Sequence, residues 1–354
     1  MLDLLLALCL AARPDICTEH MLPAAPCPAG AEAAVRAWVA DRPALRAQGW
    51  RCGTLPALEV TEVAPGLFVH PGPVEEPSPA NGGDQANVGF VIGAGAVAVI
   101  DAGGSRNMGE ALLTAIRART DLPVRWLILT HMHPDHVLGA EVFAEAGARL
   151  VTHARLPDAL RNRAESYAHG WEAQVGPRAW GATRVPAALA SAPGALHVSP
   201  GAPLALDLGG RVLRLEAMPT AHTDNDLIVT DEATGTLWLS DLAFARHTPV
   251  LDGSVLGWLS VLEDLGSRPG ARMVPGHGPV SLPWPEGLAP TRDYLSALVA
   301  ETRAALAAGE SMTEATRHLG AGLSGAWELF PLYNPRNATA AYKESWNGSE
   351  ILFL

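Results

Sequence analysis

The chain has 354 residues, of which 48% are hydrophobic and 18% are charged, and its formal net charge is −12 at pH 7. This length is enough for a large hydrophobic core and predicts about two domains. The acidic charge disfavours a nucleic acid or an anionic membrane as a partner, and no apolar run reaches the roughly 18 residues of a membrane-spanning helix. The composition also excludes a collagen, a coiled coil and a disordered chain.

Residues 1–56 are predicted to form a separate N-terminal extension, because they contain all the cysteines of the chain: Cys9, Cys17, Cys27 and Cys52. Two interpretations stay open. The cysteines form two disulfides, with three possible pairings, or they are four buried free thiols in a small helical extension. Disulfides would indicate an oxidising compartment.

The run from Leu2 to Ala12 is apolar, as the centre of a secretory signal is, but Asp3 replaces the basic start that such signals have. Cleavage after Ala11 or Ala12 is compatible with the small residues there. That cleavage would remove Cys9 and leave an odd number of cysteines. The sequence therefore leaves the state of the N-terminus open.

Residues 57–290 are predicted to form the main domain, of the α/β class, because strand-like and helix-like segments alternate along them. Strands are expected at 58–64, 67–70, 87–92, 97–100, 124–129, 149–152, 204–208, 211–218, 226–230, 237–239 and 271–274. Helices are expected at 107–119 and 135–146, with an Ala-rich helical insertion at about 157–192. Residues 291–354 are predicted to be a C-terminal helical tail, which begins with a helix at 291–308 and packs on the main domain.

Three histidines and one aspartate lie within six residues, directly after the strand at 124–129: His131, His133, Asp135 and His136. His131 and His133 are two apart on an extended segment, so both imidazoles point to the same side. Pro134 then turns the chain, which places the next two side chains where they can serve a second metal ion. Imidazole and carboxylate groups at this spacing are typical of a metal site.

Three further ligand candidates follow strands in the second half of the chain: His222, Asp241 and His277. Each lies beside small or turn-forming residues at the end of an expected strand. Loops at strand ends on a rigid scaffold are where binding residues gather. We therefore expect these side chains to join the cluster that the first motif forms.

This ordered set of residues resembles the metallo-β-lactamase superfamily over about residues 58–280. The resemblance implies a four-layer αβ/βα sandwich, carrying the small Cys-containing N-terminal extension, with two Zn²⁺ ions per chain at the sheet edges. It implies that the first zinc binds His131, His133 and His222, that the second binds Asp135, His136 and His277, and that Asp241 bridges both. Asp135 and Asp241 are thereby also catalytic candidates, and Asp101 supports the ligands from behind without touching the metal.

The branch of the superfamily is indicated by Asp241, because zinc β-lactamases have Cys or Ser there. An aspartate resembles the glyoxalase II, lactonase and other ester-hydrolase branches. Shorter blocks resemble the quinoprotein relay system zinc metallohydrolases, a SoxH-related group: the Cys-bearing start and residues 79–84, 221–226 and 334–339. That similarity implies a link to a quinoprotein system, commonly periplasmic, so a periplasmic location is favoured over a cytoplasmic one.

The expected function is that of a zinc-dependent hydrolase, which uses a metal-bridging hydroxide on an ester, thioester or lactone of a small molecule. One alternative is an iron-dependent redox enzyme, similar to persulfide dioxygenases, because imidazole and carboxylate ligands suit both metals. Another is a metal-holding accessory protein. The sequence does not name the substrate.

Six other residues near these motifs have less specific patterns. We expect His247 to be a loop histidine, Trp258 a core residue and His153 a supporting or surface residue. Asp224 and Asp226 are expected to form turns or to support the ligands, and Arg336 is expected to form an ion pair. The alternatives are a place at the substrate mouth for His247, a pocket wall for Trp258, an approach to the metals for His153 and binding of a substrate carboxylate for Arg336.

Overall fold

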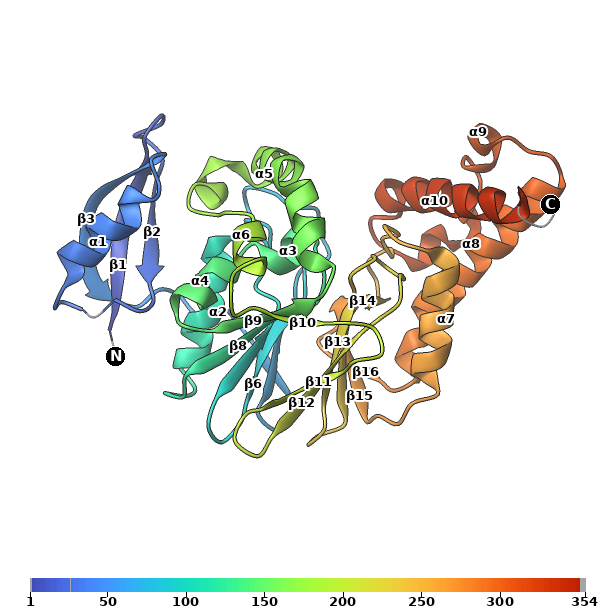
Figure 1. Cartoon of the computed structure of the whole chain (residues 1–354). Coiled ribbons are helices and arrows are strands. Elements are labelled where there is room, and N and C mark those ends of the chain that lie inside the picture. Colours follow the sequence, from blue (N-terminus) through green and yellow to red (C-terminus); the bar gives the residue numbers. More distant parts are fainter. Residues whose placement is uncertain (1, 26, 351–354) are drawn as a thin grey trace.

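The computed structural model describes residues 2–25 and 27–350 and confirms an α/β fold of four layers (Figure 1). Two sheets pack face to face, and helices cover the outer face of each. A third, smaller sheet lies in the N-terminal extension. Within the described residues, no helix combines the length and the apolar character that a membrane crossing requires.

The first large sheet has seven strands in the order β10-β9-β8-β7-β6-β5-β4, and the strands β7 to β10 run parallel. Its central strands read as continuous apolar runs because both of their faces are buried. The strands are β4 (Thr61–Ala64), β5 (Leu67–His70), β6 (Val88–Ile92), β7 (Val97–Ile100), β8 (Val124–Leu129), β9 (Arg149–His153) and β10 (Leu196–Val198).

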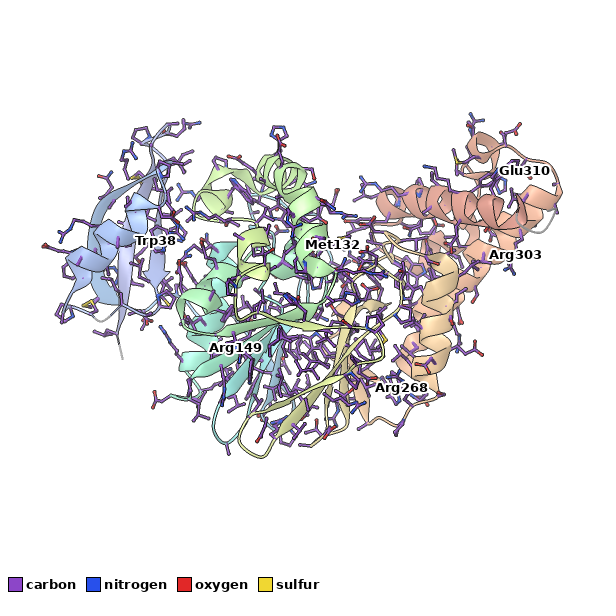
Figure 2. All side chains as sticks on the ribbon, in the orientation of Figure 1. Trp38, Met132, Arg149, Arg268, Arg303 and Glu310 are labelled. Atoms are coloured by element: carbon purple, nitrogen blue, oxygen red, sulfur yellow. A yellow bond between two sulfur atoms is a disulfide. The ribbon has the colours of Figure 1, made fainter. Side chains whose placement is uncertain are left out.

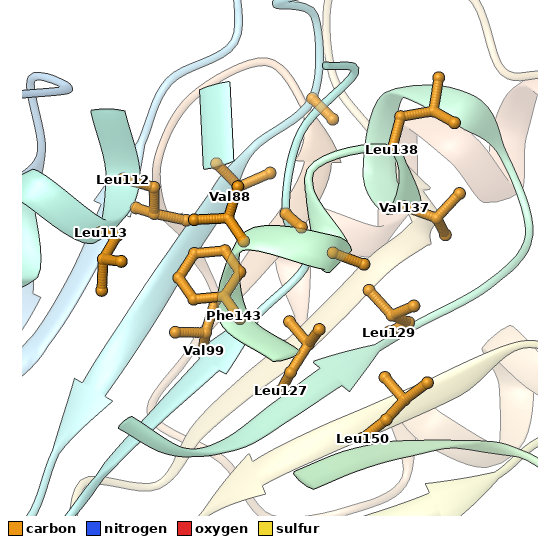
Figure 3. Close-up of a cluster of buried hydrophobic side chains, with 14 of the residues drawn as sticks. Val88, Val99, Leu112, Leu113, Leu127, Leu129, Val137, Leu138, Phe143 and Leu150 are labelled. Atoms are coloured by element: carbon orange, nitrogen blue, oxygen red, sulfur yellow. The ribbon is translucent and has the colours of Figure 1, made fainter. Parts of the chain in front are cut away.

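Helices α2 to α6 cover the outer face of this sheet: α2 (Arg106–Arg117), α3 (Pro134–Val137), α4 (Ala140–Glu145), α5 (Leu156–Trp180) and α6 (Ala187–Ala190). Leu112 and Phe143 pack against Val99 and Leu127 of the strands, all almost fully buried (Figure 3). A buried leucine or phenylalanine contributes about 1.5–3 kcal/mol of transfer free energy, so this layer is a principal core of the domain.

The second large sheet has six strands in the order β11-β12-β13-β14-β15-β16. They are β11 (Leu204–Asp207), β12 (Val212–Ala217), β13 (Leu227–Asp231), β14 (Thr236–Phe244), β15 (Arg272–His277) and β16 (Leu282–Pro283). Its outer face is covered by the C-terminal part of the chain, in the elements α7 (Val255–Gly266), η1 (Glu286–Leu288), α8 (Ala289–Ala307), α9 (Met312–Ala315), η2 (Ala321–Ala326) and α10 (Phe330–Glu350). The C-terminal helices thus pack on the main domain.

The N-terminal extension is a three-stranded sheet with one helix, so the helical interpretation of this region is wrong. The strands are ordered β2-β1-β3, with β1 (Asp3–Leu10), β2 (Cys17–Leu22), β3 (Leu45–Gly53) and α1 (Ala31–Ala40). The apolar run that resembles a signal is the central strand, and its leucines alternate between two buried faces. Cleavage after Ala12 would remove this strand.

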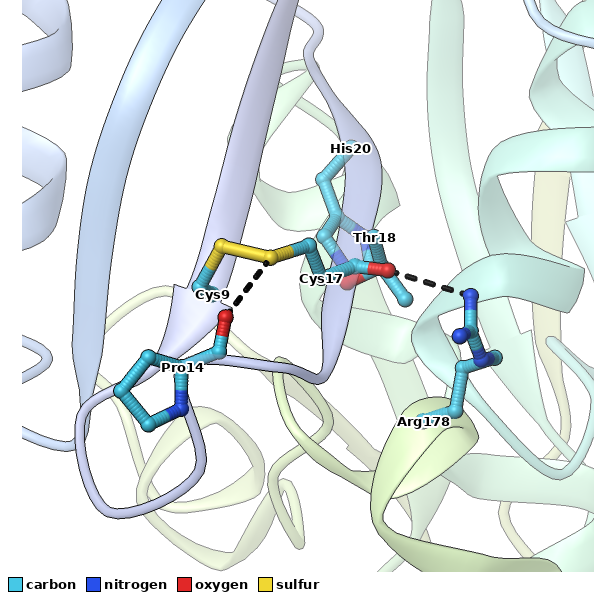
Figure 4. The surroundings of a disulfide bond; sticks show 6 residues. All are labelled: Cys9, Pro14, Cys17, Thr18, His20 and Arg178. Atoms are coloured by element: carbon cyan, nitrogen blue, oxygen red, sulfur yellow. Dashed lines mark hydrogen bonds between the residues drawn. A yellow bond between two sulfur atoms is a disulfide. The ribbon is translucent and has the colours of Figure 1, made fainter.

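Two disulfides close the extension, between Cys9 and Cys17 and between Cys27 and Cys52. The structure therefore selects the disulfide interpretation over free thiols. Figure 4 shows the first bridge at the end of the β1–β2 hairpin, where the Arg178 guanidinium donates a hydrogen bond of 3.1 Å to the Cys17 carbonyl oxygen. Arg178 belongs to α5, so this contact joins the extension to the main domain.

A buried charge network also fixes the extension to the main domain. The Arg106 guanidinium, at the start of α2, lies 2.8 Å from a Glu110 oxygen and 2.6 Å from a Glu145 oxygen. The extension completes this network: the Met21 carbonyl accepts from Arg106, and Arg42 lies 3.2 Å from Glu145. Buried charges are tolerated when they are paired in this way.

The expected helix at 135–146 is broken into α3 and α4 at Gly139. A Cβ atom at this position would lie 2.1 Å from the Ala102 carbonyl oxygen, so only glycine permits the approach of the two segments. The expected insertion helix is also bent, because Gly176 has a φ of 74° and Pro177 follows it inside α5. Strand β14 continues past the expected end at 239 as far as Phe244.

Candidate metal centre

The structure brings four of the predicted ligands together at the carboxyl end of β8 and beside β14. His133 Nδ1 lies 3.2 Å from His131 Nε2 and 3.0 Å from His222 Nε2. An oxygen of Asp241, Oδ2, lies 3.3 Å from His222 Nε2 and 3.6 Å from His131 Nε2. We call this group the first cluster. Its four ligand atoms lie within 4.8 Å of one another and can hold one metal ion.

The other three predicted ligands form a second cluster next to the first. Asp135 Oδ2 lies 3.6 Å from His136 Nε2 and 3.4 Å from His277 Nε2. The carboxylate of Asp241 reaches this group as well, with Oδ1 3.1 Å from His136 Nε2 and Oδ2 3.4 Å from His277 Nε2. One carboxylate therefore lies between the two clusters, and its role as a bridge between two metal ions stays a prediction.

The donor atoms of both clusters fit divalent metal ions. His136 Nε2 and Asp241 Oδ1 are buried and have no hydrogen-bond partner among the described residues. Buried polar atoms normally have a partner, so this pair at the junction of the two groups fits the donors of a metal site. Imidazole nitrogens and carboxylate oxygens, with no thiolate among them, suit zinc and iron alike.

Four of the histidines are oriented through their other ring nitrogen, three of them by a backbone or carboxylate oxygen and one by a hydroxyl. The Nδ1 atom lies 2.8 Å from Asp101 Oδ2 in His136, 2.6 Å from the Val250 carbonyl oxygen in His222, and 3.0 Å from the Gln85 carbonyl oxygen in His277. When Nδ1 carries the donated proton, Nε2 presents its lone pair to the cluster. The fourth is His131, whose Nδ1 lies 3.1 Å from the hydroxyl of its neighbour Thr130.

Asp101 lies behind the predicted ligands and holds their segment in place. Its two oxygens accept from the Thr130 backbone N–H and the Thr130 hydroxyl, each at 2.8 Å. The backbone of Asp101 is left-handed, with a φ of 59°. This conformation is uncommon outside glycine but is tolerated by aspartate and asparagine. It turns the side chain from the end of β7 towards the ligands.

A glycine makes room for the bridging carboxylate. A Cβ atom on Gly276 would lie 1.8 Å from Asp241 Oδ1 and 2.8 Å from the Asp241 backbone nitrogen. The parallel strands β14 and β15 shift register beside this point, next to Ser240. The close approach of the strand ends therefore depends on the absence of a side chain directly before His277.

Two histidines of the first cluster have lowered pKa values, whereas His136 and His277 of the second cluster have raised ones. Burial lowers the pKa of His222 to about 3 and the pKa of His131 well below its usual value. Burial opposes the charged form of His136 as well, but the carboxylates of Asp241, Asp135 and Asp101 outweigh it and raise its pKa well above the usual value. Burial would raise the pKa of Asp241, but His277 and the other imidazoles hold it well below the usual value.

Four of the predicted ligands, His133, Asp135, Asp241 and His277, line a cavity of about 230 Å³. Helix α5 walls one side with Trp171 and Gln174, and α10 walls another with Tyr333 and Arg336. His247 also lines it, which corrects the expectation of an ordinary loop histidine. This side chain is only 3% exposed, and its ring centre lies 4.6 Å from that of His277.

The other residues with weak patterns lie outside the two clusters. Trp258 is a core residue, as expected, and its ring packs against His222 with centres 5.3 Å apart. Asp226 is turn-forming, because its oxygens accept from the backbone and hydroxyl of Thr223. Asp224 accepts from Asn225, and His153 is buried at the end of β9.

Sequence reasoning missed Asp252, which lies 3.3 Å from His133 Nε2. It supports the one histidine that faces its cluster through Nδ1. Burial would raise the pKa of Asp252, but the hydrogen bond and charge of His133 lower it. Tyr333 and the Gln85 carbonyl were also missed. The motif Asp252-Gly253 indicates only a turn. The contact of the Gln85 carbonyl does not depend on the residue type, so the sequence does not predict it.

Comparison with known proteins gives the same superfamily. The family model described as the metallo-beta-lactamase superfamily matches residues 81–277, more than half of the chain. No curated protein matches the sequence. A beta-lactamase domain protein from Burkholderia ambifaria is similar with a TM-score of 0.60 and 20% identity, over 84% of this chain and 91% of that one.

Two further solved structures are similar at the level of the fold. A metallo-beta-lactamase family protein from Thermus thermophilus has a TM-score of 0.57 and 22% identity, over 82% of this chain and 95% of that one. A stereoselective inverting sec-alkylsulfatase from a Pseudomonas species has a TM-score of 0.58 and 18% identity, over 81% of this chain and 50% of that one.

Proposed function

Because this chain belongs to the metallo-beta-lactamase superfamily, we propose that it is a hydrolase that holds two zinc ions, one on each cluster. The bond it cleaves is that of an ester, a thioester or a lactone. The observation that carries this proposal is the position of Asp241, whose two oxygens face the histidines of both clusters. An aspartate in this position supports ester-type hydrolysis over the hydrolysis of β-lactam antibiotics.

Bound zinc would supply Lewis acidity and lower the pKa of a water ligand to about 7. The residues of the chain do the rest. Three aromatic or imidazole side chains, Trp171, His247 and Tyr333, narrow the cavity above the clusters and limit the access of bulk water. Asp135 keeps 13% of its side chain exposed towards the cavity, so it is the carboxylate placed to take a proton from a reacting group.

Metal analysis and hydrolysis measurements test this proposal together. We expect two zinc ions per purified chain and turnover of at least one substrate in a panel of thioesters, lactones and aryl esters. Asp241→Asn keeps the shape of the side chain but removes its charge, so it should lose metal and turnover together. One iron per chain would favour the oxygen-dependent redox alternative, and a metal-free protein without turnover would favour an accessory role.

We propose further that the protein works in an oxidising compartment, in line with its two disulfides. The periplasm and a quinoprotein system are the setting that the sequence resemblance implies. Mass spectrometry of thiols in the natively expressed protein tests the compartment, since four free cysteines would contradict it. Loss of the gene should lower quinoprotein-dependent dye reduction in periplasmic extracts, and unchanged reduction would remove the quinoprotein link.

A further inference from the structure

The block Asn334-Pro-Arg-Asn337 in α10 fixes that helix against the loop behind the first cluster. Asn337 accepts from the Leu251 backbone N–H at 3.0 Å and donates to the Pro249 carbonyl oxygen at 2.6 Å. Between these two residues lies Val250, whose carbonyl accepts from His222. Asn334 accepts from the hydroxyl of Tyr294 at 2.9 Å. Both asparagines are buried, so the position of α10 is tied to the ligand loop.

A stack of rings joins the same turn of α10 to the second cluster. The ring centre of His247 lies 4.6 Å from that of His277 and 4.9 Å from that of Tyr333. Three residues further along the helix, the guanidinium carbon of Arg336 lies 6.0 Å from the Tyr333 ring centre. Residues three apart share a helix face, which explains why Tyr333 and Arg336 line the same cavity.

Arg336 is the arginine of this cavity that has no carboxylate partner among the described residues, which corrects the expectation of an ion pair. The arginines nearby are paired. Arg163 lies 3.9 Å from Asp252, and Arg246 lies 2.8 Å from Glu328. Glu76 also lines the cavity, but it forms no ion pair with Arg336. A guanidinium offers five donors in a planar fork that matches a carboxylate, and this fork is open.

We propose that Arg336 binds an anionic group of the substrate, so that the enzyme prefers esters or thioesters carrying a second carboxylate, away from the bond that is cleaved. The nature of the cleaved bond rests on the function proposed above, whereas binding of the anion does not. The two buried asparagines and the ring stack hold the turn of α10 that carries Arg336 at a set position relative to the predicted metal ligands. The cavity has a volume of about 230 Å³, which limits the chain between the second carboxylate and the cleaved bond to a few atoms.

The first test measures equilibrium binding to the zinc-loaded full-length protein by calorimetry. The probes are the dicarboxylates succinate, glutarate, adipate and suberate, each compared with the monocarboxylate of equal length. One carboxylate is common to both members of a pair, so the ratio of their affinities isolates the second. We expect one dicarboxylate to bind about tenfold more tightly than its monocarboxylate, the effect of one charge-assisted contact.

Arg336→Gln should bring this ratio close to one, and Arg336→Lys should keep part of it. Arg303→Gln is the matched control, because Arg303 is an exposed arginine on α8 outside the cavity (Figure 2) and its loss changes the net charge equally. A ratio near one in the unaltered protein for all four lengths overturns the proposal. A high ratio that Arg336→Gln leaves unchanged overturns it as well.

The second test separates substrate preference from the proposed hydrolysis. The substrates are the mono-4-nitrophenyl ester of adipic acid and its methyl ester, which differ in one negative charge. We expect kcat/KM to favour the charged ester about tenfold, and Arg336→Gln to remove this preference mainly through KM. Equal turnover of both esters refutes the role of Arg336 and leaves the hydrolase proposal standing. Turnover of neither ester counts against ester hydrolysis, while the binding ratio still decides on Arg336.

Glu76→Gln distinguishes anion binding from an ion pair that closes the cavity. Glu76 is a carboxylate of the same cavity lining and lies outside the two clusters, so its removal should raise the affinity for the dicarboxylate if Arg336 binds anions. If Arg336 only pairs with Glu76, the dicarboxylate-to-monocarboxylate ratio should not depend on either side chain. Glu76→Gln, Arg336→Gln and the variant that combines both should then have the ratio of the unaltered protein. That result refutes the proposal.

Discussion

Asp101→Asn is the most informative single substitution behind the metal ligands. Asparagine keeps the shape of the side chain and tolerates the left-handed backbone at this position. The carboxylate of Asp101 accepts on both oxygens, from the Thr130 backbone N–H on one side and from His136 Nδ1 on the other, each at 2.8 Å. An amide has only one oxygen. Whichever way it is turned, its NH₂ group faces a donor.

The backbone N–H of Thr130 cannot change, so the amide oxygen stays there and the NH₂ group faces His136. His136 then moves its proton to Nε2, the atom that faces the second cluster. Changes in such supporting contacts typically lower metal affinity by 10- to 100-fold, or about 1.4–2.7 kcal/mol. We therefore expect a loss of this size at the second cluster and a much smaller one at the first, whose histidines do not touch Asp101.

Zinc competition with a chromophoric chelator at pH 7.5 measures both affinities. Ser240→Ala is the control, because the Ser240 hydroxyl is a longer and weaker contact of Asp101, at 3.3 Å. The reasoning is refuted if Asp101→Asn leaves the zinc affinity of the second cluster unchanged. It is also refuted if both sites weaken equally, since a general loosening of the fold would then be the cause. Circular dichroism of the metal-free variants separates these outcomes.

Three further predictions follow from the structure. Zinc binding to the second cluster at pH 7 should release more protons than binding to the first, because the pKa values of His136 and His277 are raised whereas those of His131 and His222 are lowered. Calorimetry in buffers of different ionisation enthalpy measures this release, and equal release at both sites contradicts the prediction. Gly276→Ala should cost metal at both clusters in a folded protein, because its Cβ would displace the bridging carboxylate; two zincs by elemental analysis would refute this. Replacing Cys27 and Cys52 by serine removes a disulfide with a sequence separation of 25 residues, so it should lower the free energy of unfolding of the extension by about 3 kcal/mol. Hydrogen exchange should become faster in β1 to β3 and stay unchanged in β7 and β8, and equal exchange in the extension would contradict this.

The ligands could be predicted from the sequence because their geometry is local or set by strand ends. His131 and His133 are two apart on one extended segment, and β8, β14 and β15 end at one edge of the sandwich. Strand periodicity and residue chemistry are therefore enough to bring the seven candidates together. Their role as metal ligands stays a prediction until an ion is measured there.

The rest of the site depends on contacts between distant segments. His247, Tyr333 and Arg336 reach the cavity because α10 packs on the loop at Pro249, through hydrogen bonds of Asn337 that no periodicity indicates. The extension was misread for a different reason. A strand buried on both faces, such as β1, is as continuously apolar as a short helix or a signal segment, so its pattern does not separate them.

The bend in α5 at Gly176 has a consequence for how substrate selection is divided within the molecule. Before the bend, Trp171 and Gln174 form a wall of the cavity, and after it Arg178 is bonded to the disulfide hairpin of the extension. The helix α5 thus has one part at the cavity and its other part on the N-terminal extension. Because both parts belong to one element, we expect substitutions in the disulfide hairpin, remote from the two clusters, to move this wall of the cavity.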